Sequence, residues 1–249
     1  MSTLRARCPD CRTLTAVAID TEYQCHACGR EFASGLVRVP TAWGSDGETM
    51  ADAAHMQLPW PEAAVVDEAT LDEEIAEVAH ELPARPFILG GSCCAHVGAI
   101  RELARRHGRI GVVWIDSHGD LNTPESSPTG NAWGMPLRML IDAGAVDPHD
   151  VTLLGARNLD PPEVEFISAA GIRQELGPLP DRVYVALDLD VIEPGDLDVF
   201  MPEAAGPSFD ELEALLRSLP TPVGAGFTGG LRTERNEQRL PHLAAALGL

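Results

Sequence analysis

Two apolar, β-branched runs of this chain end in acidic clusters, and this coincidence restricts the fold more than any other feature. The runs are residues 111–115 and 183–187. The clusters that follow are Asp116, His118 and Asp120 after the first run, and Asp188 and Asp190 after the second. Runs of this kind predict buried strands, so both clusters are expected at the ends of strands.

Between and around these runs, strand patterns alternate with helix patterns along the chain. Strands are predicted at 63–66, 86–89, 111–115, 151–155, 183–187 and 223–227, and helices at 70–82, 95–107, 135–143, 162–170, from 209 and from 236. Such alternation predicts an α/β fold: a parallel sheet in three layers, with helices on both faces. In these sheets, ligands bind beyond the carboxyl ends of the strands.

Four carboxylates and one imidazole at neighbouring strand ends would repel each other unless cations held them together. Residues two positions apart point to one side, so the members of each cluster can converge. The pattern therefore predicts a centre of two divalent cations, which lowers the pKa of a shared water. The alternative is that these residues only cap helices or end strands in solvent.

Four of the six cysteines form two closely spaced pairs near the N-terminus. Cys8 and Cys11 make the first pair and Cys25 and Cys28 the second, 13 residues later. Two such knuckles complete a closed tetrahedral Zn²⁺ shell, so a structural zinc ribbon is predicted over residues 1–38, ahead of a catalytic domain over 39–249. The alternative, a pair of disulfides, requires an oxidising compartment.

Composition excludes several classes of function. All 18 basic residues are Arg, which rules out lysine-based chemistry. The formal net charge of −20 argues against binding to nucleic acid. The N-terminal residues lack an apolar signal core and no apolar run is long enough to cross a bilayer, so a cytoplasmic protein without membrane contact is expected.

The motifs after residue 85 resemble those of the ureohydrolase family, which includes arginase and agmatinase. The segment 90–93 resembles the family's Gly-Gly-Asp-His, and 116–123 resembles its Asp-Ala-His-x-Asp-x-Asn-Thr. The segment 129–131 is similar to its Ser-Gly-Asn, and 155–160 to a segment that ends in a substrate-binding Asp. Asp188 and Asp190 are similar to its last metal motif.

The resemblance implies roles for individual residues and an arginase-like fold with two cations, Mn²⁺ by analogy. The implied metal ligands are Cys93, Asp116, His118, Asp120, Asp188 and Asp190. The implied substrate-binding residues are Asn122, Thr129, Asn131, Trp133 and Asp160, and the implied catalytic residues are Asp120, His118 and Glu211, with Glu211 receiving the guanidinium. A homo-oligomer is also implied.

The chain departs from the family pattern at two positions. Cys93 stands where the family has a metal-binding His, and a thiolate favours softer ions such as Zn²⁺, Fe²⁺ or Co²⁺. Trp133 stands where arginases have a His thought to protonate the leaving amine, and indole has no such proton to give. A substrate with a less basic leaving group, such as an N-hydroxyguanidine, would need that proton less.

Several of these residues can also be explained by a structural role alone. Glu211 lies three residues after Ser208, which makes a helix-start capping box. Cys93 and Cys94 can be buried thiols, and His96 can be a structural residue. Asn122 and Thr129 can cap turns, and Asp160 can begin a helix.

The function expected from the sequence is metal-dependent hydrolysis of a guanidino group. The substrate would be arginine, hydroxyarginine or a related small guanidino compound, and the product urea or a urea derivative. Two alternatives stay open. One is an amide hydrolase of the deacetylase type, which uses a single Zn²⁺ on the same fold. The other is a degenerate ureohydrolase that acts as a binding or regulatory protein.

Overall fold

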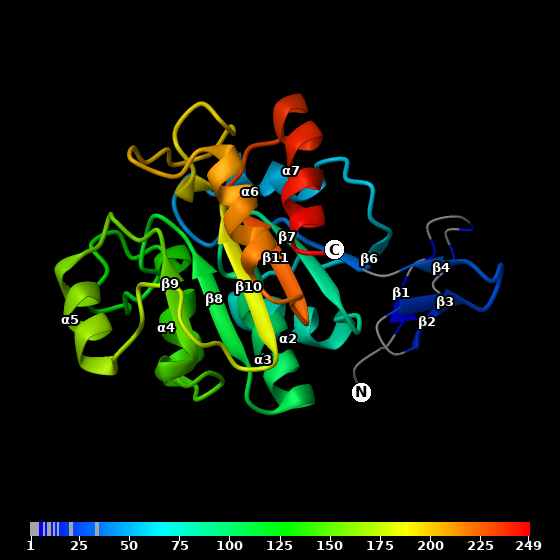
Figure 1. Cartoon of the computed structure of the whole chain (residues 1–249), viewed down its shortest axis with the longest axis horizontal. Helices are drawn as coiled ribbons and strands as arrows, with labels where there is room; N and C mark the ends of the chain where they lie inside the picture. The colour runs from blue at the N-terminus through cyan, green and yellow to red at the C-terminus, as the bar shows by residue number, and fades with distance from the viewer. Residues whose placement is uncertain are drawn as a thin grey trace.

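The computed structural model describes residues 35–249 and, nearer the N-terminus, residues 5–6, 8, 11, 13, 15–19 and 22–32. Figure 1 shows a large central sheet surrounded by helices, with a small N-terminal sheet beside one edge of it. The large sheet has seven strands in the order β6-β5-β7-β11-β10-β8-β9. Every strand pair in it is parallel.

The strands of the large sheet are β5 (Gly35–Val39), β6 (Glu62–Val65), β7 (Pro86–Gly90), β8 (Gly111–Ile115), β9 (Val151–Leu154), β10 (Val183–Asp188) and β11 (Gly224–Thr228). The helices are α1 (Glu48–Ala51), α2 (Leu71–Glu81), α3 (Ala95–His107), α4 (Pro136–Asp142), α5 (Pro161–Ala170), α6 (Phe209–Ser218) and α7 (Glu234–Ala246). Short 3₁₀ turns lie at Asp52–His55, Ala132–Gly134, Pro148–Asp150 and Leu189–Val191.

Side chains alternate between the two faces of the sheet, and each face has its own core. Val112 and Trp114 of β8 pack with residues of α2, α3, α4 and α5. Val113 and Ile115 of the same strand pack with residues of α6 and α7 on the opposite face. A strand buried on both sides reads as a continuous apolar run. The prediction of a three-layer α/β fold is confirmed.

The large sheet begins earlier in the chain than the sequence indicated. Strand β5, Gly35–Val39, pairs with β6 and β7, so the predicted boundary between residues 38 and 39 falls inside this strand. Its five residues are all buried. The run is short and directly follows the cysteine-rich segment, and it acquires its place in the fold only through its two neighbours in the sheet.

The N-terminal region forms a four-stranded antiparallel sheet of β1 (Arg5–Ala6), β2 (Ala16–Ile19), β3 (Glu22–Cys25) and β4 (Glu31–Phe32). Tyr23 packs into the core of the large domain, and its hydroxyl accepts a hydrogen bond from the Ala84 amide. In the described part of the chain, no helix is both long and apolar enough to span a membrane.

The four N-terminal cysteines lie together, and all six cysteines are free thiols. The four sulfur atoms lie within 4.8 Å of one another, with Cys8–Cys28 and Cys11–Cys25 separations of 3.5 Å. A regular tetrahedron of thiolates 2.3 Å from Zn²⁺ has edges of about 3.8 Å. The cluster therefore fits a structural zinc ion and gives no support to disulfides.

Helix α2 contributes a carboxylate to the interior. Glu74 is 0% exposed, and neither of its carboxylate oxygens has a hydrogen-bond partner among the described residues. Burial raises the pKa of Glu74 to about 7, although the nearby Trp43 indole opposes this rise. The folded state therefore holds a proton on Glu74 that the unfolded chain releases at lower pH.

We predict that Glu74 makes the protein less stable as the pH rises from about 4.5 to 7. The unfolded state binds fewer protons than the folded state in this window, so the free energy of unfolding falls, by about 3 kcal/mol for this residue. Denaturant titration at pH 4.5 and pH 8 measures the free energy of unfolding of Glu74→Gln and of the native chain. The difference between variant and native chain should change in favour of the variant by about this amount from pH 4.5 to pH 8. Glu77→Gln on the same helix is the matched control, and an equal difference at both pH values would contradict the prediction.

Candidate metal centre

The order of the strands places the two acidic clusters side by side. Strands β8 and β10 are parallel neighbours, so Asp116, directly after β8, lies beside Asp188 at the end of β10. Two groups of possible metal ligands result, each with ligand atoms within 4.8 Å of one another. One is Cys93, Asp116 and Asp188, and the other is Asp116, His118 and Asp190. Asp116 belongs to both, as expected of a bridging carboxylate.

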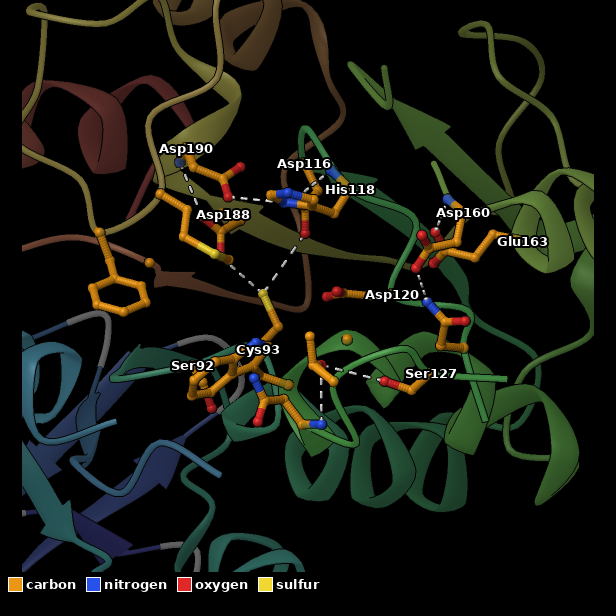
Figure 2. A pocket seen from close by; sticks show the side chains of 18 of the residues that line it. Ser92, Cys93, Asp116, His118, Asp120, Ser127, Asp160, Glu163, Asp188 and Asp190 are labelled. Atoms are coloured by element: carbon orange, nitrogen blue, oxygen red, sulfur yellow. Dashed lines mark hydrogen bonds and ion pairs between the residues drawn. The ribbon is translucent and has the colours of Figure 1, made fainter. Parts of the chain in front are cut away.

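Local hydrogen bonds hold these carboxylates in place. The His118 amide donates to Asp116 Oδ1 over 2.7 Å, and the Trp114 indole donates to Asp116 Oδ2 over 3.2 Å. The Asp190 amide donates to Asp188 Oδ1 over 2.9 Å, and the Ser117 hydroxyl donates to Asp190 Oδ1 over 2.6 Å. The second oxygens of the other two carboxylates face candidate ligands: Asp188 Oδ2 lies 3.1 Å from the Cys93 sulfur and Asp190 Oδ2 lies 3.0 Å from His118 Nδ1 (Figure 2).

Cys93 follows a third strand, β7, and its side chain lies beside the two acidic clusters. It lies between β7 and α3, and its thiol donates to Asp188 Oδ2 over 3.1 Å and lies 3.8 Å from Asp116 Oδ2. The adjacent Cys94 is buried on the other side of the backbone turn and does not line the cavity. The structure therefore brings Cys93, and not Cys94, to the acidic clusters.

Asp120 supplies the strongest sign that this site accepts a cation. Its Oδ2 is buried and has no hydrogen-bond partner among the described residues, although a buried carboxylate oxygen normally has one. Its backbone is in the left-handed region, with φ of 53°. The residue lines the cavity (Figure 2). It lies outside both ligand groups but opposite them, where it could complete the shell that includes Cys93.

The electrostatics of the site also favour cations. Burial, together with the neighbouring carboxylates Asp116 and Asp188, raises the pKa of Asp120 well above its usual value. Burial and the charge of Asp190 raise the pKa of Asp188 to about 7. Burial opposes protonation of His118, but Asp116 and Asp190 raise its pKa to about 12. Divalent cations would replace these protons and relieve the repulsion.

The clusters line a cavity of about 200 Å³. Its polar wall consists of the candidate metal ligands, with Asp160 and Glu163 on the far side (Figure 2). Its apolar wall consists of Met50, Pro128, Trp133, Phe200 and Met201. The volume suits a small molecule with one polar and one apolar end.

The loop after β8 presents one free amide group to the cavity. Asn131 Oδ1 accepts hydrogen bonds of 2.9 Å from both the amide and the hydroxyl of Ser45. This fixes the orientation of the side chain, so its Nδ2 is the group available to a ligand. The Thr129 hydroxyl accepts from the Asn131 amide over 3.2 Å. Both residues line the cavity and could bind a carboxylate.

Asn122 and Asp160 are bound to each other instead. Asn122 Nδ2 donates to Asp160 Oδ2 over 2.8 Å, while its Oδ1 accepts from Ser126. Asp160 also caps α5 in a capping box with Glu163. Asn122 therefore orients Asp160, and both residues line the cavity.

Trp133 forms part of the apolar wall. Its ring lies 6.2 Å from that of Phe200 in an edge-to-face contact, and its amide donates to the Trp43 carbonyl over 3.2 Å. Gly44 packs directly on the indole, and a Cβ at this position would lie 2.5 Å from the ring. Residues 43–45 thus brace both Trp133 and Asn131 from behind.

The structure does not bring Glu211 to this site. Its carboxylate accepts from the Ser208 amide and hydroxyl over 2.9 and 2.7 Å in the capping box of α6. The residue is exposed and does not line the cavity. The expectation that Glu211 receives a guanidinium is not supported by its position, because the capping geometry already occupies the carboxylate.

Several residues that line the cavity were not identified from the sequence. They include Ser92, Glu163, Phe200, Met201 and Met50. Glu163 is the only one with a local signal, since it stands three residues after the helix-capping Asp160. The others come from α1 and from loops far apart in the chain, and only the fold gathers them.

The fold and the site together define a class: a three-layer α/β protein with a carboxylate-rich metal centre beyond the carboxyl ends of its parallel strands. Comparison with known proteins agrees, since the pattern of the Arginase family matches residues 37–227. The chain belongs to the arginase family.

Individual relatives are similar over part of the chain or over the fold. The arginase of Bacillus subtilis is 31% identical over 166 residues, which cover 54% of this chain and 56% of that protein. The arginase of Staphylococcus aureus is 38% identical over 98 residues, 35% of this chain and only 32% of that protein. The crystal structure of Bacillus subtilis arginase superposes with a TM-score of 0.73 at 22% identity, covering 86% of this chain and 97% of that chain.

We predict that the centre binds two divalent ions besides the zinc of the N-terminal cysteines. Asp120→Ala and Asp190→Ala should each lose at least one of the two, because each removes a ligand from a different end of the site. Elemental analysis after equilibrium dialysis measures the content. Asp142→Ala, which removes an exposed carboxylate of α4, should keep both ions. Full metal content in both site variants would contradict the ligand assignment.

Proposed function

We propose that this protein is a metal-dependent hydrolase that cleaves the C–N bond of a small guanidino compound and releases urea or a urea derivative. The observation that supports this best is the pair of ligand groups that share Asp116 beside a cavity of about 200 Å³. Membership of the arginase family supports the same reaction class.

Two divalent cations, when bound, would lower the pKa of a water molecule and polarise the guanidino carbon. Asp116 and Asp188 would hold both ions, with His118 and Asp190 at one end and Cys93 and Asp120 at the other. Asp120 lines the cavity beside the two ligand groups. It is the carboxylate placed to take the proton of the attacking water and pass it to the departing nitrogen.

The rest of the cavity suits the other end of an amino-acid-like substrate. Asn131 Nδ2 and the Thr129 hydroxyl can donate to a carboxylate. Asp160, oriented by Asn122, can accept from an ammonium group. The apolar wall at Trp133 and Phe200 would pack against the methylene chain between the two ends and exclude water from the reacting carbon.

Two features favour hydroxyarginine over arginine. Glu211 lies outside the cavity, and the carboxylates that line the cavity have other partners or roles. Asp116, Asp188 and Asp190 belong to the ligand groups. Glu163 accepts from the Leu121 and Asp160 amides, and Asp160 is assigned to the ammonium group. A permanently charged guanidinium is then poorly received, whereas hydroxylation lowers the basicity of the group and allows it to bind uncharged. The alkylamine that leaves is the same in both substrates, so it is the basicity of the bound group, and not that of the leaving group, that distinguishes them.

We predict that the metal-loaded protein hydrolyses hydroxyarginine with a kcat/KM at least about 10²-fold above that for arginine, the size of effect expected when a buried charge has no partner in the site. The measurement is a urea and hydroxyurea release screen over arginine, hydroxyarginine, agmatine and guanidinobutyrate. Trp133→His should raise arginine turnover, and Trp133→Phe is its control. Efficient arginine hydrolysis with no preference for hydroxyarginine would contradict the substrate proposal.

The screen also separates the alternatives. A single ion beside the ribbon zinc, together with hydrolysis of acylated amines, would indicate an amide hydrolase. Two bound ions with no turnover of any guanidino or acylated compound would indicate a binding or regulatory protein.

We predict that Glu211 stabilises α6 and takes no part in turnover. Glu211→Gln keeps a capping box, so its kcat/KM should stay within about twofold of the native value. Ser208→Ala should lower the free energy of unfolding by about 1 kcal/mol through loss of the cap, again with kcat/KM unchanged. Steady-state kinetics and denaturant titration test both, and a loss of about 10²-fold in Glu211→Gln would restore the role inferred from the sequence.

A further inference from the structure

A row of buried polar side chains leads away from Cys93 into the protein. The Cys93 sulfur lies 3.0 Å from the Thr228 hydroxyl, which lies 3.4 Å from His96 Nε2. His96 Nδ1 in turn lies 3.0 Å from the Tyr184 hydroxyl. The row crosses from the loop before α3 to β11, back to α3 and on to β10. Thr228, His96 and Tyr184 are each at most 1% exposed.

The fold makes room for this row at one glycine. Gly226 stands two residues before Thr228 on the same face of β11, and a Cβ there would lie 2.7 Å from the His96 ring. The imidazole therefore packs directly on the strand. Its edge contacts with Trp114 and Tyr184, at centroid distances of 5.4 and 5.8 Å, fix its plane. His96 does not line the cavity and cannot take part there directly.

The hydrogen bonds of the row can run in only one direction. The buried Tyr184 hydroxyl has His96 as its sole partner in the described part of the chain, so its proton must go to His96 Nδ1 or remain unpaired at a cost. Complete burial lowers the pKa of His96 to about 3, so the ring is neutral and has one N–H. That N–H is then on Nε2 and donates to Thr228.

The Thr228 hydroxyl consequently turns its own proton toward the metal centre. The acceptors in reach there are the Cys93 sulfur, at 3.0 Å, and Asp188 Oδ2, at 3.3 Å. A cysteine that binds a metal ion does so as a thiolate, which is an acceptor only. The direction of the row therefore matches a thiolate at Cys93.

We propose that Thr228, oriented by His96 and Tyr184, is a positioning residue that donates a hydrogen bond to the Cys93 thiolate when this residue binds a metal ion. The inference rests on the metal centre of the proposed function but adds residues outside it. It makes the two metal positions unequal: His118 and Asp190 would provide one nitrogen and one oxygen ligand at the first, whereas the second would have a sulfur ligand whose charge is stabilised by Thr228.

The proposal is tested with Co²⁺, because a thiolate ligand gives a sulfur-to-cobalt charge-transfer band. The full-length protein is titrated with Co²⁺, and the spectrum of the matching Cys93→Ser variant is subtracted to remove the band of the N-terminal cysteines. A hydrogen bond to a thiolate moves this band to higher energy. Thr228→Val should therefore shift the Cys93 band to longer wavelength and weaken Co²⁺ binding by about 10- to 100-fold, and Thr228→Ser should restore both.

Thr152→Val is the matched control. Thr152 is a fully buried threonine of β9 whose hydroxyl has no partner among the described residues, and its replacement should leave band and affinity unchanged. If Thr228→Val does not fold, Thr228→Ala serves in its place. An unchanged band and affinity in the Thr228 variants would overturn the inference while the metal centre stands. Absence of any Cys93-dependent band in the native chain would overturn Cys93 as a ligand as well.

The part played by His96 has its own measurement. Long-range ¹H–¹⁵N spectra of the Zn²⁺-loaded protein report which ring nitrogen has the proton, and Nε2–H is expected. Tyr184→Phe removes the donor to Nδ1 and should shift this tautomer balance together with the Cys93 band. A proton on Nδ1 in the native chain would overturn the direction of the row.

Discussion

The structure depends on one constraint, the parallel register of β7, β11, β10 and β8. Parallel strands end at the same edge of a sheet, so whatever follows them in sequence meets there. Here the residues that follow are Cys93, Asp116 and Asp188, which come from distant parts of the chain and meet within 4.8 Å. The apolar cores on the two faces of the sheet hold these strand ends together although the carboxylates repel one another. Bound cations would remove that repulsion.

A second layer of hydrogen bonds gives the site its precision. Trp114 and the His118 amide fix Asp116, Ser117 fixes Asp190, and Thr228 lies against Cys93. Trp114 and Thr228 stand on strands β8 and β11, and Ser117 and His118 lie in the loop directly after β8, so the sheet that gathers the ligands also places their donors. Thr228 stands on β11, the strand beside β7, and its hydroxyl lies 3.0 Å from the Cys93 sulfur.

Much of this was predictable from local patterns. Helix α3 begins and ends at the predicted residues. The strand before it, Gly108 after it and the apolar face between them all predict the same bounds. The acidic clusters were recognisable because carboxylates rarely follow buried strands without a reason. Glu211 was expected in the site, but the structure places its carboxylate in the capping box of α6, because a capping box and a ligand-binding carboxylate look the same in sequence. Strand β5 was not predicted, because its five residues have no periodicity of their own.

The sequence by itself determined the fold class and the residue types of the candidate metal ligands, since both follow from patterns at short spacings. Only the tertiary structure decided which residues complete the site. Residues 43–45 brace Asn131 and Trp133, Phe200 closes the apolar wall, and the row of Tyr184, His96 and Thr228 leads to Cys93. These contacts join segments up to 135 positions apart. They depend on side-chain direction and on space left by glycine, neither of which is a local property of the chain.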